Sequence, residues 1–308
     1  MVQNKPNKHH YIPKFYLKRW SGFDGRLCEF SRPYDHVKPR RTAPDGTGYV
    51  RGLYTLRGFE PDLAQQIEER FFGTTDCEAS DVLGILETKG PDGASEGPLR
   101  SAWSRFLLSL LLRTPENIEG LRAQWEHTFA KTDTETEAEY ANVRQPGRPA
   151  TFAEYLRSMP VEQIDRYLFG VFIPLVDNVR VGTILNKMVW SVFTAAKTRF
   201  EFLTSDRPIV RTPLNIPDGY LALPIGPRKL FLATNSLDVI RRFQNANQDR
   251  LVADMNARVV GGAIKYVYGS SDTQRQFVSN RMGTEIKSFA IIDPRFPSPE
   301  HVQPTIRI

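Results

Sequence analysis

Two adjacent histidines near the start of the chain, His9 and His10, have side chains that could transfer protons or bind a metal ion. Neighbouring side chains of an extended segment point to opposite sides, so at most one of the two faces a given site. Four aromatic residues follow within the next ten positions, and this apolar surface predicts that the N-terminal segment docks on the rest of the protein. The alternative is that both histidines are structural residues, hydrogen-bonded beside that aromatic cluster.

A carboxylate in the second half of the chain, Asp206, follows an apolar stretch and precedes Arg207 and Pro208. A carboxylate at the end of a strand can be held rigidly while it reaches a cleft, which suits a metal ligand or a general base. The alternative is a structural turn, because Thr-Ser-Asp before proline lets the hydroxyl and carboxylate groups accept hydrogen bonds from nearby backbone N–H groups.

A glutamate and an arginine on two predicted helices form a third candidate set. Glu68 lies on the helix expected at residues 61–72, and Arg113 lies in the last turn of the helix expected at 99–113. If the helices pair, Arg113 is buried and needs a carboxylate or an anionic ligand. The alternative is a surface ion pair with a cation at a helix C-terminus. Asn256, on another predicted helix, is expected to face the same cleft.

The elements that must position these residues follow from hydrophobic periodicity. An extended segment and a short helix at 9–20 and a strand at 26–30 precede a loop at 33–52. The middle of the chain is predicted to be helical, at 61–72, 79–88, 99–112, 116–130, 151–180 and, as a buried helix, 186–196. An acidic stretch at 131–150, which ends in proline and glycine, predicts an exposed excursion.

Beyond residue 198 the apolar period becomes two, which is typical of strands. Strands are expected at 199–203, 209–211, 220–225, 229–233, 265–269 and 289–292, and helices at 237–244 and 249–263. The predicted fold class is α+β, with a helical middle layer and a mixed or antiparallel sheet built from N- and C-terminal segments.

Composition limits the function classes. The 308 residues are 40% hydrophobic and 25% charged, with no secretion signal at the start and no uninterrupted apolar run of a membrane-spanning helix, so a cytoplasmic protein with no membrane contact is expected. The two cysteines, Cys28 and Cys77, suggest neither a disulfide framework nor a zinc site. The sequence contains no P-loop motif, which argues against nucleotide-driven phosphoryl transfer, and no HExxH motif.

Positive charge is concentrated near the N-terminus. The chain carries +6 overall, and residues 1–60 contain twelve Lys and Arg against five Asp and Glu, a net charge of +7. A basic face of this kind binds phosphates better than the same charge spread evenly, so nucleic acid is an expected partner. The alternative is an ordinary solvated basic surface.

Five segments together resemble the DUF4238 family of bacterial proteins: residues 9–17 (HHYIPKFYL), 112–115 (LRTP), 202–208 (FLTSDRP), 223–227 (LPIGP) and 251–269. The resemblance implies a single domain over residues 1–308, and it favours a functional role for His9 or His10, Arg113 and Asp206. It implies no substrate.

These observations predict a bacterial hydrolase. The most specific form of this prediction is a metal-dependent nuclease that cleaves phosphodiesters. Asp206, one of the two histidines and Glu68 would bind Mg²⁺ or Mn²⁺ or act as acid and base, and Arg113 would hold a phosphate. The substrate-binding residues would be Arg207, Lys14, Lys18 and Asn256. The alternative is a non-catalytic protein that binds nucleic acid or a partner and whose histidines and aspartate are structural.

Overall fold

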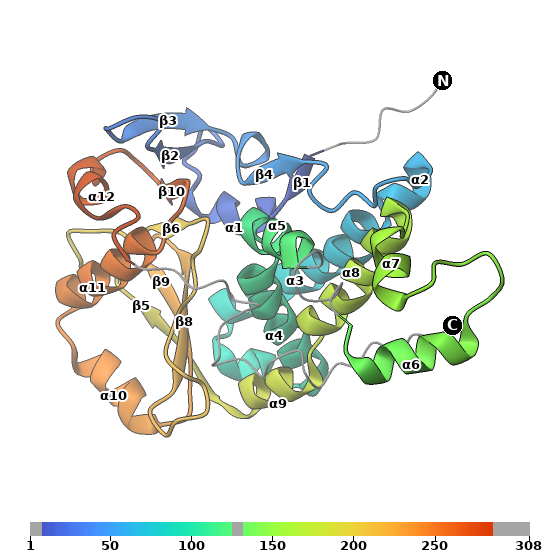
Figure 1. Cartoon of the computed structure of the whole chain (residues 1–308). Helices are drawn as coiled ribbons and strands as arrows, with labels where there is room; N and C mark the ends of the chain where they lie inside the picture. Colours follow the sequence, from blue (N-terminus) through green and yellow to red (C-terminus); the bar gives the residue numbers. More distant parts are fainter. Residues whose placement is uncertain (1–7, 125–131, 286–308) are drawn as a thin grey trace.

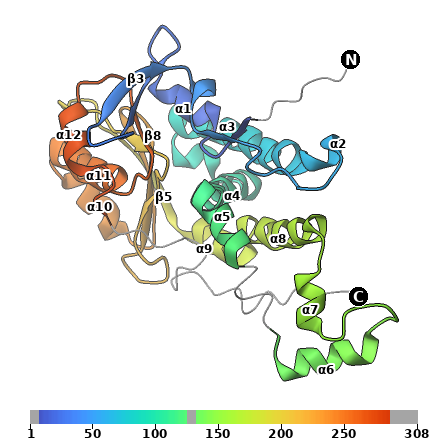
Figure 2. The ribbon, with the colours of Figure 1, turned by 45° about the horizontal axis from the view of Figure 1, so that its top comes forward.

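The computed structural model describes residues 8–124 and 132–285, and it has the α+β class that the sequence predicts (Figure 1). Helices from the middle of the chain lie beside sheets formed by strands from both ends. In the view of Figure 2, helices α6 (Thr134–Val143) and α7 (Phe152–Arg157) project from the body formed by the other elements.

One antiparallel sheet joins the two ends of the chain. Its strand order is β3-β2-β10-β6. Strand β10 pairs with β2 from Tyr266 opposite Ser31 to Gly269 opposite Cys28, and with β6 on its other side. The prediction of a sheet built from N- and C-terminal segments is therefore confirmed. The strand bounds are β2 Leu27–Ser31, β3 Lys38–Thr42, β6 Thr204–Ser205 and β10 Tyr266–Gly269.

A second antiparallel sheet, β5-β9-β8-β7, lies between two helical layers. On β9, Phe231 packs with the large core around helix α4, whereas Leu230 and Leu232 pack with helices α10 and α11. Because successive side chains point to opposite faces, both faces of this strand are buried. The bounds are β5 Val189–Thr194, β7 Val210–Arg211, β8 Tyr220–Gly226, β9 Lys229–Thr234, α10 Leu237–Asn245 and α11 Gln248–Gly261.

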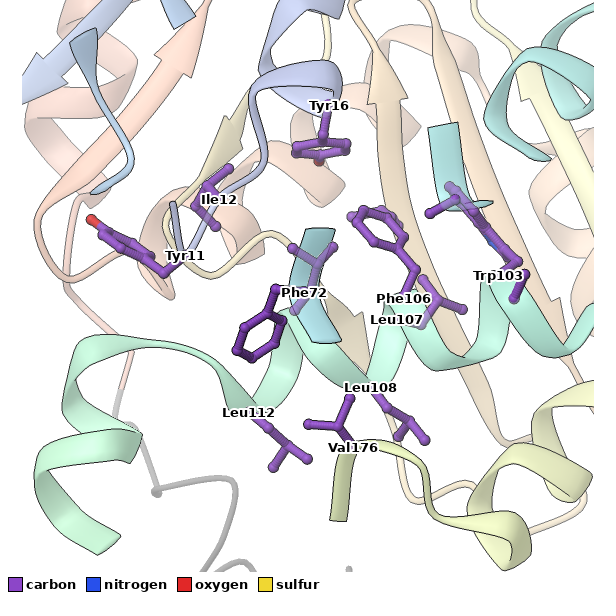
Figure 3. Close-up of a cluster of buried hydrophobic side chains, with 14 of the residues drawn as sticks. Tyr11, Ile12, Tyr16, Phe72, Trp103, Phe106, Leu107, Leu108, Leu112 and Val176 are labelled. Atoms are coloured by element: carbon purple, nitrogen blue, oxygen red, sulfur yellow. The ribbon is translucent and has the colours of Figure 1, made fainter. Parts of the chain in front are cut away.

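The main helical layer is organised around α4 (Gly97–Leu112), as its wide apolar face predicts. Trp103, Phe106 and Leu107 of α4 are fully buried, and Phe106 lies below Tyr16 of the N-terminal segment in Figure 3. The surrounding helices are α2 Pro61–Ala64, α3 Gly73–Thr88, α5 Pro115–Gln124, α8 Val161–Val176 and α9 Val179–Lys187, with the short 3-10 helix η4 at Pro91–Ala94. Helix α12, Arg275–Arg281, packs near the first sheet.

The N-terminal segment docks, as its aromatic content predicts. It consists of β1 (Lys8–His10), α1 (Lys14–Leu17) and the 3-10 helix η1 (Lys18–Trp20). The Tyr16 hydroxyl donates to the carbonyl oxygen of Pro224 at 2.7 Å and accepts from the hydroxyl of Thr204 at 2.7 Å. Trp20 Nε1 donates to the carbonyl oxygen of Phe202 at 2.8 Å. These bonds attach the segment to both sheets.

A small sheet holds the start of this segment. Strand β1 pairs antiparallel with β4 (Tyr49–Arg51), which follows the 3-10 helix η2 (Pro44–Gly46). Between η2 and β4, Gly48 has a φ of +64°, and its carbonyl oxygen accepts from the backbone N–H of Ile12 at 3.1 Å. A Cβ at Gly48 would lie 3.1 Å from the Ile12 carbonyl oxygen, so both the conformation and the contact favour glycine.

Several predicted elements are wrong. The helix expected at 186–196 is strand β5, whose valine, tryptophan and phenylalanine residues pair with β9. Residues 199–203 form no strand; the backbone N–H of Phe202 donates instead to the carbonyl oxygen of Pro227. The loop expected at 33–52 contains β3 and β4. The excursion at 131–150 contains helix α6 and is exposed at most of its described residues, so the prediction of exposure is not contradicted. The strand expected at 289–292 lies outside the described residues.

One stretch, Val161–Lys187, is long and apolar enough to cross a membrane by length and composition alone. Asp177 and Asn178 divide it into α8 and α9, and Leu168, Phe169 and Phe172 belong to the main core. Because core helices of soluble proteins pass the same test, the stretch carries no argument about a membrane.

The docking of the N-terminal segment is testable at Tyr16. Tyr16→Phe removes the hydroxyl group and leaves two buried oxygen atoms without this partner, so we expect the free energy of unfolding to fall by about 1–3 kcal/mol. Urea unfolding followed by circular dichroism measures the change. The matched control is Tyr34→Phe, at an exposed tyrosine, which should change stability by less than about 0.5 kcal/mol. Equal stability of both variants would contradict the role of Tyr16.

Candidate functional site

The two adjacent histidines have different surroundings, as the alternation along strand β1 predicts. His9 uses both ring nitrogens within the protein. Nδ1 accepts from the backbone N–H of Tyr54 at 2.9 Å, so Nε2 carries the proton and donates to Oε1 of Gln65 at 2.6 Å. The His9 ring also stacks on Tyr54 at 5.6 Å between centroids, and burial lowers the pKa of the imidazole. His9 is therefore a neutral structural residue.

His10 keeps one ring nitrogen free for chemistry. The side chain is buried, and Nε2 has no hydrogen-bond partner among the described residues. The Asp45 backbone acts to raise the pKa of the ring, as an acceptor of its N–H does, and because Nε2 has no partner among the described residues, Nδ1 is the ring nitrogen left to carry that proton. Burial, followed by the positive charge of Lys14, lowers the pKa of His10 from 6.5 to about 4. At neutral pH the Nε2 atom therefore presents a lone pair.

Glu68 lies beside His10 on an unusual helical turn. Residues Ile67–Phe72 form a π-helix, η3, which runs directly into α3, so the two separate helices predicted at 61–72 and 79–88 are partly continuous. Such turns are frequent at functional sites. Oε1 of Glu68 accepts from the backbone N–H of His10 at 3.3 Å, and Oε2 is buried without a partner. Burial raises the pKa of Glu68 from 4.5 to about 7, and Arg113 opposes this shift.

Arg113, which follows the last turn of α4, is completely buried. Nη1 donates to Oδ1 of Asp76 at 2.9 Å, and the guanidinium carbon lies 5.4 Å from the ring centroid of Phe72 and 5.9 Å from that of Phe106. The backbone carbonyl oxygen of Arg113 accepts from the Tyr54 hydroxyl at 2.6 Å. Nε and Nη2 are buried and have no hydrogen-bond partner in the ranges 8–124 and 132–285. These two atoms form the side-on edge of the guanidinium, which suits bidentate binding of a carboxylate or phosphate.

Two other arginines show how this edge is normally used in the protein. Arg40 donates from Nε and Nη2 to the two carboxylate oxygens of Glu29 at 3.1 and 3.2 Å. Arg57 donates from the same two atoms to Oδ1 of Asp165 at 3.0 and 2.6 Å. The corresponding edge of Arg113 meets no such carboxylate among the described residues. An anionic ligand would complete it in the same way.

Three of the predicted residues are therefore brought together from distant parts of the chain. His10 from β1 bonds to Glu68 from η3, and the charge of Arg113 acts on the pKa of both. Two partners of Arg113, Asp76 and Tyr54, were missed from the sequence. A buried arginine needs a carboxylate partner, and this requirement was the only signal in the sequence. It did not show which acidic residue of the helical layer is the partner, Asp76 or another.

Asp206 has the environment of a structural residue and not that of a metal ligand or general base that reaches a cleft. Oδ1 accepts from the backbone N–H of Ile264 at 2.9 Å, and Oδ2 accepts from the backbone N–H groups of Lys265 and Tyr266. Burial raises the pKa of Asp206 to about 6, and these three hydrogen bonds oppose the shift. The carboxylate thus holds the end of β6 against the start of β10. This role is structural, but the backbone groups that it binds lie 58 to 60 residues away and not in the local turn that the sequence offered as the alternative.

The predicted substrate-binding residues differ in their surroundings, and one of them is structural, as Asp206 is. The side-chain amide of Asn256 donates to the carbonyl oxygen of Glu201 and accepts from the backbone N–H of Leu203. Asn256 therefore has a structural role, in contrast to the predicted position facing the cleft. Arg207 Nη2 lies 3.7 Å from Oε2 of Glu116, and its buried Nε has no partner among the described residues. Lys14 and Lys18 are exposed, and the charge of Lys14 reaches His10 and Glu68.

The predicted metal ligands do not form a cluster. Within residues 8–124 and 132–285, no group of three or more His, Cys, Asp or Glu side chains is arranged to hold a metal ion. Asp206, His10 and Glu68 are therefore not joined as a three-residue set. His10 and Glu68 remain adjacent, and two such side chains can bind Mg²⁺ or Mn²⁺ when a substrate phosphate supplies further oxygen ligands.

Comparison with known proteins gives one match. A family model described as "Protein of unknown function (DUF4238)" matches residues 8–273, a range that includes all the candidate residues above. No curated protein and no solved structure matches the chain.

The structural role of Asp206 is testable by stability. Asp206→Ala leaves three backbone N–H groups without their acceptor, and hydrogen bonds to charged groups contribute about 1.5–3 kcal/mol each, so we expect a loss of at least about 3 kcal/mol. Urea unfolding measures this loss, with Asp35→Ala at an exposed aspartate as the control. A variant as stable as the control would show that the three bonds do not hold the two strands together.

The unusual protonation of Glu68 is testable without any ligand. Because its pKa is raised to about 7 on folding, the folded protein binds this proton more tightly than the unfolded chain. The Glu68 contribution to the free energy of unfolding therefore decreases between about pH 4.5 and about pH 7, by up to about 3 kcal/mol. Glu68→Gln should gain stability relative to the wild type over this range. Urea unfolding at about pH 5 and about pH 8 measures it, and a pH-independent difference would contradict the shift.

Proposed function

This chain belongs to the DUF4238 family, for which no function is assigned, and we propose that it is a hydrolase that cleaves a phosphate ester at His10, Glu68 and Arg113. The proposal retains the reaction class expected from the sequence. It moves the acid–base chemistry from Asp206 to the neighbouring pair His10 and Glu68, because the oxygens of Asp206 are engaged by backbone N–H groups.

The observation that carries the proposal is a set of buried polar atoms without partners. His10 Nε2, Glu68 Oε2 and Arg113 Nε and Nη2 come from three separate elements. The backbone N–H of His10 bonds to Glu68, and Arg113 lies close enough for its charge to act on the pKa of both residues. Each buried polar atom that makes no hydrogen bond costs about 1–3 kcal/mol. A substrate that accepts from Arg113 and exchanges protons with the other two residues would use all four atoms.

The opposite pKa shifts of His10 and Glu68 support different proton-transfer roles for the two residues. His10 is neutral and its Nε2 can accept a proton, whereas Glu68 is still partly protonated near neutral pH and can donate one. Environments that separate the pKa values of two neighbouring groups in this way are typical of acid–base pairs. Arg113 would hold the phosphoryl oxygens and stabilise the negative charge that develops on them.

The reaction balances with these residues and one water molecule. The water oxygen forms a bond to phosphorus while the bond between phosphorus and the leaving oxygen breaks. Nε2 of His10 takes the proton from water, and Oε2 of Glu68 gives its proton to the leaving oxygen. Proton exchange with solvent then returns both residues to their initial states. A bound Mg²⁺ or Mn²⁺ would add charge stabilisation at the same phosphate.

A nuclease is the form of this activity that the charge distribution supports. Lys8 and Lys14 lie close enough to His10 for both charges to lower its pKa, and the exposed Lys14 can contact a phosphate outside the buried site. The expected substrates are therefore nucleic acids or nucleotides, with a bacterial, cytoplasmic setting as the expected context.

A second candidate is a protein that binds an anionic partner without reaction. The observation in its favour is that His9, Asp206 and Asn256 are all engaged in internal hydrogen bonds. In that case the free atoms of His10, Glu68 and Arg113 would bind the anion and transfer no proton.

Catalysis is the testable difference between the two candidates. The purified protein should cleave linear DNA or RNA, a nucleotide, or 4-nitrophenyl phosphate, assayed in EDTA, Mg²⁺ and Mn²⁺. His10→Gln and Glu68→Gln should each lower kcat about a hundredfold to ten-thousandfold. His36→Gln, at an exposed histidine, is the control and should leave kcat unchanged. Absence of cleavage under all three conditions by folded protein would favour the binding candidate.

The pH dependence of kcat/KM has a defined sign. Below about pH 4 His10 becomes protonated and cannot accept a proton, and above about pH 7 Glu68 loses the proton that it must donate. The activity should therefore be highest between these values and fall on both sides. A rate that continues to rise well above pH 7 would contradict the assignment of Glu68 as the acid.

A further inference from the structure

We infer, on the basis of the function proposed above, that the site takes a terminal phosphate, at the end of a chain or on a small molecule, with two of its oxygens bound by Nε and Nη2 of Arg113. An internal phosphodiester of a continuous strand would not fit this arrangement.

The first argument is the geometry of the guanidinium. Asp76 occupies Nη1 at 2.9 Å, so the side-on edge formed by Nε and Nη2 remains for a ligand. Arg40 and Arg57 each use this edge to bind a carboxylate of the protein, with distances between 2.6 and 3.2 Å. A ligand of Arg113 is therefore expected to present two oxygens on one atom, as phosphates and carboxylates do.

The second argument is the number of free oxygens. A terminal phosphate has three non-bridging oxygens, so two can accept from Arg113 while the third meets Glu68 Oε2 or a water held by His10 Nε2. An internal phosphodiester has only two, and both would be used by the arginine. A simple carboxylate also has only two. The terminal phosphate thus accounts for the partnerless atoms of all three residues.

The third argument is enclosure. Arg113 is 0% exposed and His10 is 8% exposed. The rings of Phe72 and Phe106 lie within 6 Å of the guanidinium carbon, and the Tyr54 hydroxyl bonds to the Arg113 backbone. A continuous strand has to enter the site and leave it on another side, whereas an end group needs one way in. Surroundings this closely packed favour the end group.

The experiment compares three small probes on the whole protein. Inorganic phosphate represents a terminal phosphate, dimethyl phosphate represents an internal diester, and acetate represents a carboxylate. Isothermal titration calorimetry and the ligand-dependent rise in melting temperature report binding. We expect inorganic phosphate to bind at least about tenfold more tightly than either of the other probes, a difference of about 1.4 kcal/mol.

Two variants and one control connect the binding to the site. Arg113→Lys keeps a positive charge beside Asp76 but loses the bidentate edge, and it should weaken phosphate binding about tenfold or more. If this variant does not fold, His10→Asn, which leaves the arginine unchanged, should also weaken phosphate binding. The control is Arg40→Lys, whose edge already binds Glu29 and which should bind phosphate as the wild type does.

The outcomes separate the inference from the proposed function. If dimethyl phosphate or acetate binds as tightly as inorganic phosphate and both variants weaken that binding, the terminal-phosphate inference is wrong while the anion site stands. The same conclusion would follow if the protein cleaves covalently closed circular nucleic acid and the His10→Asn variant does not. If no probe binds, or binding is unchanged in both variants, the inference and the anion-binding role of Arg113 in the proposed function are both wrong.

Discussion

The burial of the Arg113 guanidinium is the constraint on which the site depends. A charge removed from water is strongly destabilising unless it is paired and hydrogen-bonded. Asp76 supplies one ion pair, and the faces of Phe72 and Phe106 add weaker attraction. Only one of the three guanidinium nitrogens has a hydrogen-bond partner among the described residues. The surrounding helices therefore hold an incompletely satisfied cation in place, which suits an anion-binding site better than a purely structural ion pair.

The docked N-terminal segment supplies the second part of the site. Tyr16 and Trp20 bond to groups about two hundred residues away, and this long-range attachment fixes the direction in which β1 continues towards η3. Strand β1 itself pairs over three residues with β4, and a two-stranded sheet of this size is marginally stable on its own. The position of His10 therefore depends on the bonds that the rest of the N-terminal segment makes with the two larger sheets.

Much of the fold could be predicted from the sequence, but the partners of its polar groups could not. The apolar face of α4 and the alternation of β8 and β9 are local patterns, and both predictions are confirmed. Strand β5 was predicted as a helix because a short apolar run is compatible with either structure until its partner β9 is known. Asp206 resembled a catalytic carboxylate because the backbone groups that bind it lie nearly sixty residues later in the chain.

The same limit explains why the sequence alone could not show which of the two histidines is structural. Alternation along β1 requires that His9 and His10 face opposite sides, but the choice is made by Tyr54 and Gln65, which bond both nitrogens of His9. Other buried ionic groups of the protein, such as Glu29 and Asp165, are likewise satisfied by arginines. Single partnerless atoms also occur elsewhere in the part of the chain that the structure describes, as on Trp103 and Asn117, whereas His10, Glu68 and Arg113 have four between them. These three residues are also linked by the hydrogen bond from His10 to Glu68 and by the charge of Arg113. Their four partnerless atoms are the atoms that the proposed anionic ligand would bind.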